Sequence, residues 1–205
     1  MALSLVGANH AADTAVAADV VSRTISVRLH DYALLDDDEL LAAERQVADI
    51  YASVGVLIDW RQPVRPARIT AGIEEWPRDP AATLTVLVVT SPMAHGIGVK
   101  NDVAGYAAVS PTDGGSVAFV VADRTRRIAE SGGVPHTRVL SQVIAHELAH
   151  LLMPDRPHSH DGIMRATWHP IDFRYEMTRA FSRAEAEIIR RGVARLSRLA
   201  HQTAN

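Results

Sequence analysis

The residues best suited to chemistry lie in one short segment, HELAH, at positions 146–150. On an α-helix with 3.6 residues per turn, His146 and His150 stand one turn apart on the same face. Two imidazoles placed in this way can bind one zinc ion at about 2.0–2.1 Å. Glu147 lies too far round the helix to be a ligand, but it can hydrogen-bond a zinc-bound water and take its proton. The segment therefore predicts a zinc site that activates water.

A catalytic zinc ion usually has three protein ligands and one open position, so a third ligand must come from elsewhere in the chain. The downstream candidates are His158, His160, Asp155, Asp161, Glu185 and Glu187. We prefer His158, with His160 as its rival, because histidine is the usual third ligand where imidazoles are abundant. Pro154 and Pro157 bracket a turn that can bring the chain back toward the helix. The alternative interpretation is a plain helix with surface His and Glu side chains.

The helix that carries these histidines is predicted over residues 136–152. Apolar residues recur along one side of it at helical spacing, at Leu140, Ile144, Leu148 and Leu151, and Pro154 ends it. This pattern indicates an amphipathic helix, which is the structural context that the zinc motif requires.

Strands and helices are mixed along the rest of the chain, which indicates an α+β fold. Period-two or continuous apolar patterns predict strands at residues 24–30, 56–60, 83–90, 105–110 and 116–122. Helices are predicted at residues 36–54, at 171–180 and from 182 to about 199, and a proline-rich loop at 61–82. Ser182 and Glu185 have the spacing of a capping box at the start of the last helix.

The composition excludes several classes of protein. The chain has 205 residues, with 21 basic and 24 acidic side chains and a net charge of −3, which argues against binding nucleic acid through phosphate contacts. No apolar run approaches the ~20 residues of a membrane helix. The absence of Cys excludes disulfides, thiol nucleophiles and sulfur-ligated zinc. We expect no nucleic-acid or membrane partner and a monomer, with secretion and a cytoplasmic location both open.

Residues 146–164, HELAHLLMPDRPHSHDGIM, resemble the zinc segment of the metzincin clan of zinc peptidases. That clan carries HExxHxxGxxH, followed by a turn with an invariant Met beneath the metal. The closer resemblance is to uncharacterised bacterial metzincin-like proteins in which HExxH is followed by HSxxGIMR. This chain departs from the clan pattern at Met153, where a glycine is usual, and in a spacing to the third His that is two residues longer.

The resemblance implies a role for each matching residue. The zinc ligands would be His146, His150 and His158. Glu147 would be the general base, and Met164 would be the Met-turn residue. Tyr175 would be a possible oxyanion donor, and Trp168 would pack below the site. The other histidines, His30, His95 and His169, have no partner pattern and are expected to be structural or exposed.

The resemblance also implies a fold and an activity. A mixed twisted sheet with the active-site helix would occupy residues 24–152, and the Met-turn and last helix would lie below the cleft in 153–205. Together they would form one zinc endopeptidase domain acting on a peptide or protein substrate. The strand at 116–122 would be the sheet edge to which an extended substrate adds. The alternatives are a zinc-holding binding module and a latent enzyme.

Two further expectations concern the flanking segments. Residues 1–23 are small and apolar without a basic start, so we expect a flexible tail or the remnant of a signal or pro-segment. Arg124, Arg126 and Arg127 follow the expected edge strand and are expected to be solvated, because isolated surface charge usually has no binding role.

Overall fold

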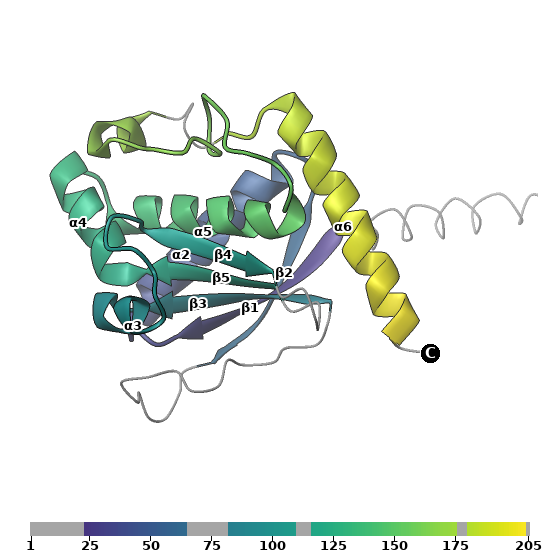
Figure 1. Cartoon of the computed structure of the whole chain (residues 1–205), viewed down its shortest axis with the longest axis horizontal. Helices are drawn as coiled ribbons and strands as arrows, with labels where there is room; N and C mark the ends of the chain where they lie inside the picture. The colour runs from purple at the N-terminus through teal and green to yellow at the C-terminus, as the bar shows by residue number, and fades with distance from the viewer. Residues whose placement is uncertain (1–22, 65–81, 110–115, 176–179, 204–205) are drawn as a thin grey trace, which may run out of the picture.

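A five-stranded mixed sheet runs through the centre of the molecule (Figure 1). The computed structural model describes residues 23–64, 82–109, 116–175 and 180–203. The strands are β1 (Thr24–Asp31), β2 (Leu57–Val64), β3 (Thr83–Val89), β4 (Gly105–Val109) and β5 (Ser116–Val121). Their order across the sheet is β2–β1–β3–β5–β4, and β4 runs antiparallel to β5 while the other described pairs are parallel.

The residue patterns of the strands explain their burial. In β1, Ile25, Val27 and Leu29 alternate with more polar residues and pack into the core. The sequence of β3, TLTVLVV, is apolar or β-branched throughout, and the strand is buried on both faces, as its pattern predicts. Successive side chains of β3 enter two different apolar clusters, which shows that both faces of the sheet are covered.

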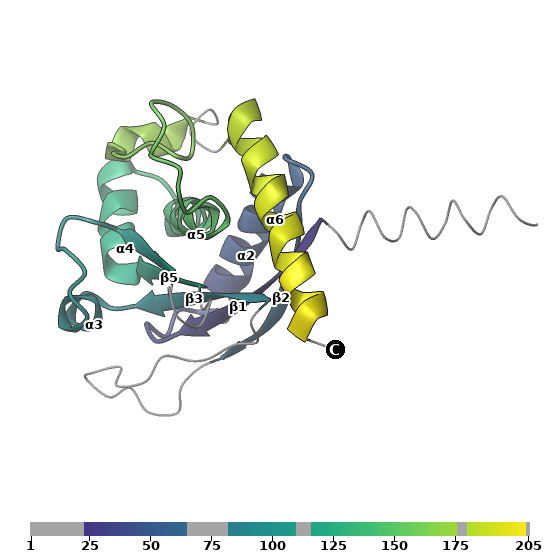
Figure 2. The ribbon, with the colours of Figure 1, turned by 45° about the vertical axis from the view of Figure 1, so that its right-hand side comes forward.

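The helices divide between the two faces of the sheet (Figure 2). They are α2 (Asp37–Ala52), α3 (Ser91–Gly96), α4 (Ala122–Gly132), α5 (His136–Leu152) and α6 (Arg183–Thr203), with a 3-10 turn η1 (Pro170–Arg174). α5 packs on the larger core between α2 and α4, and α3 belongs to the smaller cluster on the opposite face. None of the described helices has the length and apolar character of a membrane span.

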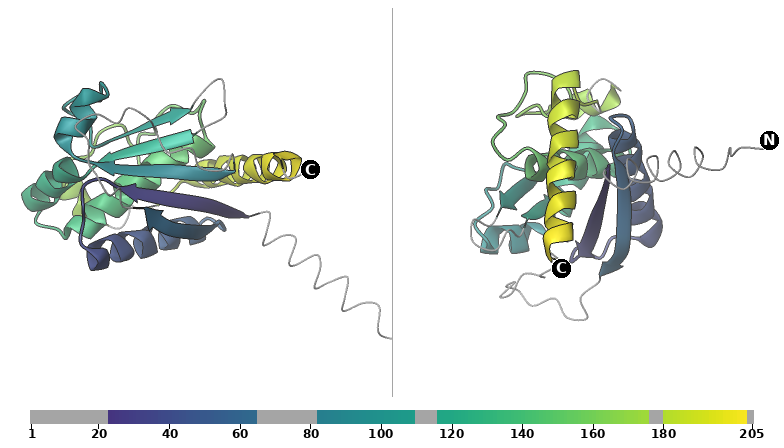
Figure 3. Two further views of the ribbon diagram at one scale, coloured as in Figure 1. Left: turned by 90° about the horizontal axis from the view of Figure 1, so that it is seen from below. Right: turned by 90° about the vertical axis from the view of Figure 1, so that its right-hand side faces the viewer.

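The chain after α5 turns back over this helix, on the side away from the sheet (Figure 1). Residues 153–175 form this return segment, and α6 then crosses the end of α5 and runs along the molecule (Figure 3). The crossing is close at Gly192, where an added Cβ would collide with the carbonyl oxygen of Leu152. The expected architecture is confirmed: a mixed twisted sheet with the motif-bearing helix above it, and a return segment and last helix beyond.

Several local expectations need correction. α3 and α4 are helices that the sequence patterns do not reveal. The helix expected at 171–180 is replaced by the short turn η1, and residues 176–179 lie outside the described part. Strand β2 continues to Val64, into the region expected to be loop, of which residues 65–81 are not described. The expectations for the tail fall on residues 1–22, which also lie outside the described part.

The expected edge strand at 116–122 is wrong in its position within the sheet. β5 lies inside the sheet, between β3 and β4, because it pairs in parallel with β3 and antiparallel with β4. The edge beside α5 is therefore β4, which precedes β5 in the chain. Strand order depends on pairing between distant residues, so the apolar pattern of residues 116–121 could not reveal it.

Candidate metal centre

Helix α5 holds the HELAH segment in the middle of the protein. Its residues from Val139 to Ala149 are all buried, because α2, α4, the sheet and the return segment surround it. The hydroxyl of the fully buried Tyr51 donates a hydrogen bond of 2.9 Å to the carbonyl of Ala145, one residue before His146. The backbone that carries the two histidines is therefore fixed from α2 as well as by its own helix.

Three imidazole rings converge at one point above α5. The Nε2 atom of His146 lies 3.0 Å from that of His150 and 3.3 Å from that of His158. The Nε2 atoms of His150 and His158 are 3.1 Å apart. Ligands bound to zinc at 2.0–2.1 Å in a tetrahedral arrangement are about 3.3 Å apart. Within the described residues this group alone meets the requirements of a metal site, and its spacing fits zinc.

Contacts behind His146 orient its ring. Its Nδ1 donates a 2.7 Å hydrogen bond to the carbonyl of Ile163, which leaves Nε2 unprotonated and available as a ligand. The Trp168 ring packs edge to face against the His146 imidazole, with 5.0 Å between the ring centroids. Met164, directly after Ile163, is 1% exposed and belongs to the main core. These contacts place Trp168 beside the ring and Met164 in the packing that supports Ile163.

Burial keeps two of the imidazoles neutral. Burial, together with the neighbouring His150 and His158, lowers the pKa of His146 to about 3, against a raising effect of the Ile163 carbonyl. Burial and His158 lower the pKa of His150 to about 4. At neutral pH both rings carry a free lone pair, as a metal ligand requires.

Glu147 stands beside the three histidines and lines the same cleft. The residue is 6% exposed, and burial raises the pKa of its carboxyl to about 8. A carboxyl group with a raised pKa is suited to take up a proton near neutral pH and release it again. A bound cation would oppose the effect of burial by favouring the ionised form.

The return segment brings His158 to the pair on α5 through a tight loop. The amide of Ser159 donates to the carbonyl of Met164 at 2.7 Å, and Ser159 and Arg165 form an isolated β-bridge. Gly162 turns the loop with a φ of 74°, a left-handed conformation that suits glycine. The two additional residues relative to the metzincin spacing lie before this loop, among residues 151–157.

A buried carboxylate fastens this loop to the last helix. Ser159 Oγ donates a short hydrogen bond to Glu185 Oε1, and Glu185 Oε2 accepts the amide of Ser182 at 2.7 Å. The amide of Glu185 in turn donates to Ser182 Oγ at 3.3 Å, which confirms the predicted capping box. Glu185, a candidate ligand in the sequence, is therefore occupied as a cap and lies behind His158.

The other candidate ligands stand apart from the three imidazoles. The His160 side chain is 97% exposed and pairs with Asp161 at 3.2 Å. Asp155 is exposed, and Glu187 pairs with Arg183 at 3.7 Å on the surface of α6. The structure therefore brings His158, and not His160, to the pair on α5.

The remaining residues from the sequence analysis have other places. Tyr175 is 59% exposed and does not line the cleft. His169 caps η1 together with Asp172, His95 is exposed on α3, and His30 is buried in β1.

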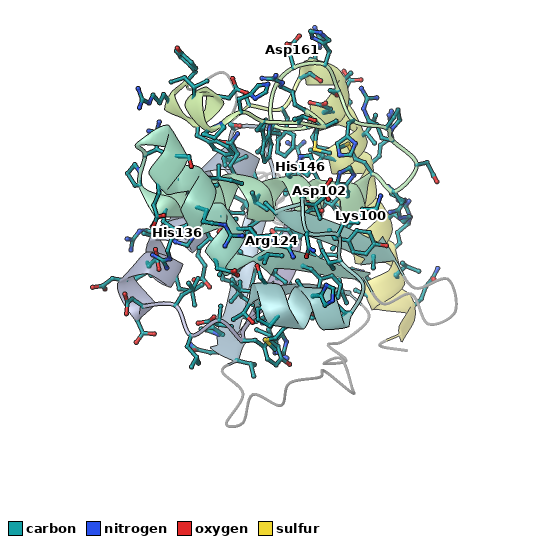
Figure 4. The ribbon with its side chains drawn as sticks, turned by 60° about the vertical axis from the view of Figure 1, so that its left-hand side comes forward. Lys100, Asp102, Arg124, His136, His146 and Asp161 are labelled. Atoms are coloured by element: carbon teal, nitrogen blue, oxygen red, sulfur yellow. The ribbon has the colours of Figure 1, made fainter. Side chains whose placement is uncertain are left out.

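The three histidines open into a cleft of about 1090 Å³. One wall is formed by residues 97–100 and 102–107, which include the first three residues of the edge strand β4, and the other by residues 165–168 and Phe173. Figure 4 shows Lys100 and Asp102 on the side of the molecule where His146 lies. The cleft thus runs between a sheet edge and the return segment, with the histidines and Glu147 at its floor.

Arg124 supports the first wall, and its expected exposure to solvent is wrong. The residue is 5% exposed, and its guanidinium donates to the carbonyls of Lys100 and Val103 at 2.6 and 2.7 Å. It also donates to Ser91 Oγ at 3.2 Å. The neighbouring Arg126 and Arg127 do lie at the surface, as expected, where they pair with carboxylates. No local pattern distinguishes the buried arginine from its neighbours.

Comparison with known proteins bears on the fold. No protein-family model matches the chain, and no curated protein matches it either. Among solved structures, the archaemetzincin of Methanopyrus kandleri matches with a TM-score of 0.56 at 14% identity, over 83% of this chain and 96% of that protein. The chain therefore has the fold of an archaemetzincin, with three histidines that could hold a metal ion in its cleft.

Proposed function

We propose that this protein is a zinc-dependent endopeptidase of the metzincin type, with Glu147 as its general base. The observation that carries the proposal is the convergence of three imidazole Nε2 atoms, 3.0–3.3 Å apart, beside a buried carboxyl group in an open cleft. The likeness in fold to an archaemetzincin supports it, as does the HSxxGIMR segment that follows HELAH.

His146, His150 and His158 would hold the ion, and the remaining position would face the cleft. Zinc, when bound there, lowers the pKa of a coordinated water and polarises a carbonyl group. Glu147 accepts a proton from the attacking water and returns it to the leaving amine. The Ile163 carbonyl keeps His146 in the tautomer that can bind the metal. The protein would thus supply three fixed imidazole ligands and a carboxyl group that transfers one proton.

The walls of the cleft support an extended peptide as the substrate. β4 is an edge strand, and it lines the cleft beside Glu147. An edge strand has free backbone groups that can pair with an added strand, so affinity would come from main-chain hydrogen bonds. Much of the remaining lining is apolar and includes Val99, Val103 and Trp168. We therefore propose that the substrate is a peptide or an unfolded protein segment. It would pair with β4, and not with the strand at 116–122 that the sequence analysis expected at the edge.

Cleavage of a diverse pool of unstructured peptides, read by mass spectrometry, tests this function. Zinc-loaded wild type is compared with zinc-loaded Glu147→Ala, which should bind the metal but lose turnover. Cuts that appear only with wild type support the peptidase and give its sequence preference. Equal activity of both proteins excludes this mechanism. Zinc binding without any cuts favours the alternatives, a binding module or a latent enzyme.

A further inference from the structure

Gly105, the first residue of β4, lies against the side chain of Glu147. A Cβ atom at this position would stand 2.5 Å from Glu147 Oε1, 2.7 Å from its Cγ and 2.9 Å from its Cδ. Real Cβ atoms essentially never approach other heavy atoms so closely. Only glycine therefore leaves room for the observed position of the Glu147 side chain.

The glycine is required here for space and not for backbone conformation. Gly105 is absent from the described glycines with positive φ, which are Gly55, Gly98, Gly133 and Gly162. Its backbone has the ordinary geometry of a strand residue, which any L-amino acid adopts. The backbone conformation at position 105 would thus accept a side chain, but the side chain would collide with Glu147.

The backbones that carry Gly105 and Glu147 are both held in place. Gly105 pairs with Val120 in the ladder, and the carbonyl of the preceding Ala104 accepts the amide of Val121 at 2.8 Å. Glu147 belongs to α5, whose residues from Val139 to Ala149 are all buried. An added methyl group would therefore displace the Glu147 carboxyl group and leave the strand and the helix in place.

We propose that Gly105 is a positioning residue for Glu147: the bare backbone of the edge strand forms the surface against which the carboxyl group is held. The contact between Gly105 and Glu147 is independent of the proposed function, and only its role in catalysis rests on that function. The strand that would pair with the substrate also limits the rotamers of the general base. The same strand, β4, would then position both the Glu147 carboxyl group and the backbone of the bound peptide.

A double-mutant cycle on the metal-free protein tests the contact without any assay of activity. Gly105→Ala is made in wild type and in Glu147→Ala, and the urea midpoint of unfolding is measured for all four proteins. We expect Gly105→Ala to lower the midpoint in the wild-type background. In the Glu147→Ala background the clash is absent, so the midpoint should be unchanged or raised, because alanine restricts the unfolded chain more than glycine does.

Ala108→Ser is the matched control, since it adds one atom on the same strand toward the smaller apolar cluster and not toward the cleft. Its effect should be the same in both backgrounds. If Gly105→Ala folds only together with Glu147→Ala, the coupling is shown in its strongest form. Equal shifts in both backgrounds, or failure of both Gly105→Ala proteins to fold, overturn the proposal.

A second readout separates positioning from a general loss of structure. In zinc-loaded Gly105→Ala, the zinc dissociation constant should stay within about twofold of wild type, because the three histidines are not contacted. If the wild type cleaves peptides, kcat should fall at least tenfold with little change in KM. A wild type without activity removes the proposed function, while the midpoint cycle still decides whether Gly105 positions Glu147.

Discussion

The hydroxyl of Ser159 donates a hydrogen bond to the buried carboxylate of Glu185, 26 residues further along the chain. This bond joins the loop that carries His158 to the first turn of α6. Glu185 is fully buried and also accepts the amide of Ser182, so one carboxylate serves both a helix cap and the support of a candidate ligand. Groups behind a metal ligand fix its orientation and thereby affect metal affinity.

Removing this bond should weaken zinc binding. Ser159→Ala keeps the His158 side chain but removes the hydrogen bond that ties its loop to α6. We therefore expect the zinc dissociation constant to rise about tenfold, the lower end of the range for such supporting groups. Glu185→Ala also removes the helix cap and should lower the unfolding free energy by ~1–3 kcal/mol in addition. Competition with a zinc-binding dye measures the affinities, and urea denaturation measures the stability.

Glu187→Gln is the control for this pair of variants. Glu187 lies on the same turn of α6 but is exposed, and it forms an ion pair with Arg183 at the surface. Its replacement should leave both zinc affinity and stability unchanged. An unaltered affinity in Ser159→Ala would show that His158 needs no support from α6.

The choice between the two downstream histidines can be measured directly. His158→Ala removes one of three converging imidazoles, so zinc affinity should fall by at least about a hundredfold. His160→Ala should leave the affinity unchanged, because the His160 side chain is exposed and pairs with Asp161. Isothermal titration calorimetry with zinc distinguishes the two. A large loss in His160→Ala would mean that the loop rearranges when the metal binds.

The raised pKa of Glu147 makes the stability of the metal-free protein depend on pH. The folded protein keeps its proton up to about pH 8, whereas the unfolded chain loses it near pH 4.5. Between these values folding takes up a proton, so the contribution of Glu147 to stability falls as pH rises. The stability of wild type relative to Glu147→Gln should fall by at least about 2 kcal/mol from pH 5 to pH 8.

Urea denaturation in the presence of a chelator, at pH values from 4 to 9, measures this difference. The difference should be level below pH 4.5 and again above about pH 8, where both states have the same protonation. A difference that rises with pH would show that the carboxyl group is stabilised in its ionised form, which contradicts the effect of burial.

Arg124 provides a test of the cleft wall. Arg124→Lys keeps the charge but loses the fork that reaches the carbonyls of both Lys100 and Val103. We expect a looser wall, a several-fold higher KM for peptides and an unchanged zinc affinity. Arg127→Lys, at a surface arginine paired with Asp123, is the matched control and should alter neither quantity. Equal kinetics in the two variants would mean that the wall does not contribute to peptide binding.

Features that depend on neighbouring residues could be predicted from the chain alone. The helix carrying HELAH, the pairing of His146 with His150, the buried strand TLTVLVV and the capping box of Ser182 and Glu185 all follow from spacings of a few residues. Helix α4 could not be predicted from such spacings. Its buried residues include Ala122, Thr125 and Ala129, which give no apolar stripe.

The sequence by itself determined which residues could bind a metal and which helix presents them, since the helical repeat places His146 and His150 together. Only the tertiary structure decided that β4 and not β5 is the edge strand, and that His158 and not His160 completes the group. It also decided that Gly105 contacts Glu147 and that Arg124 is buried. Each of these depends on contacts between residues far apart in the chain, whose free energies no local pattern contains.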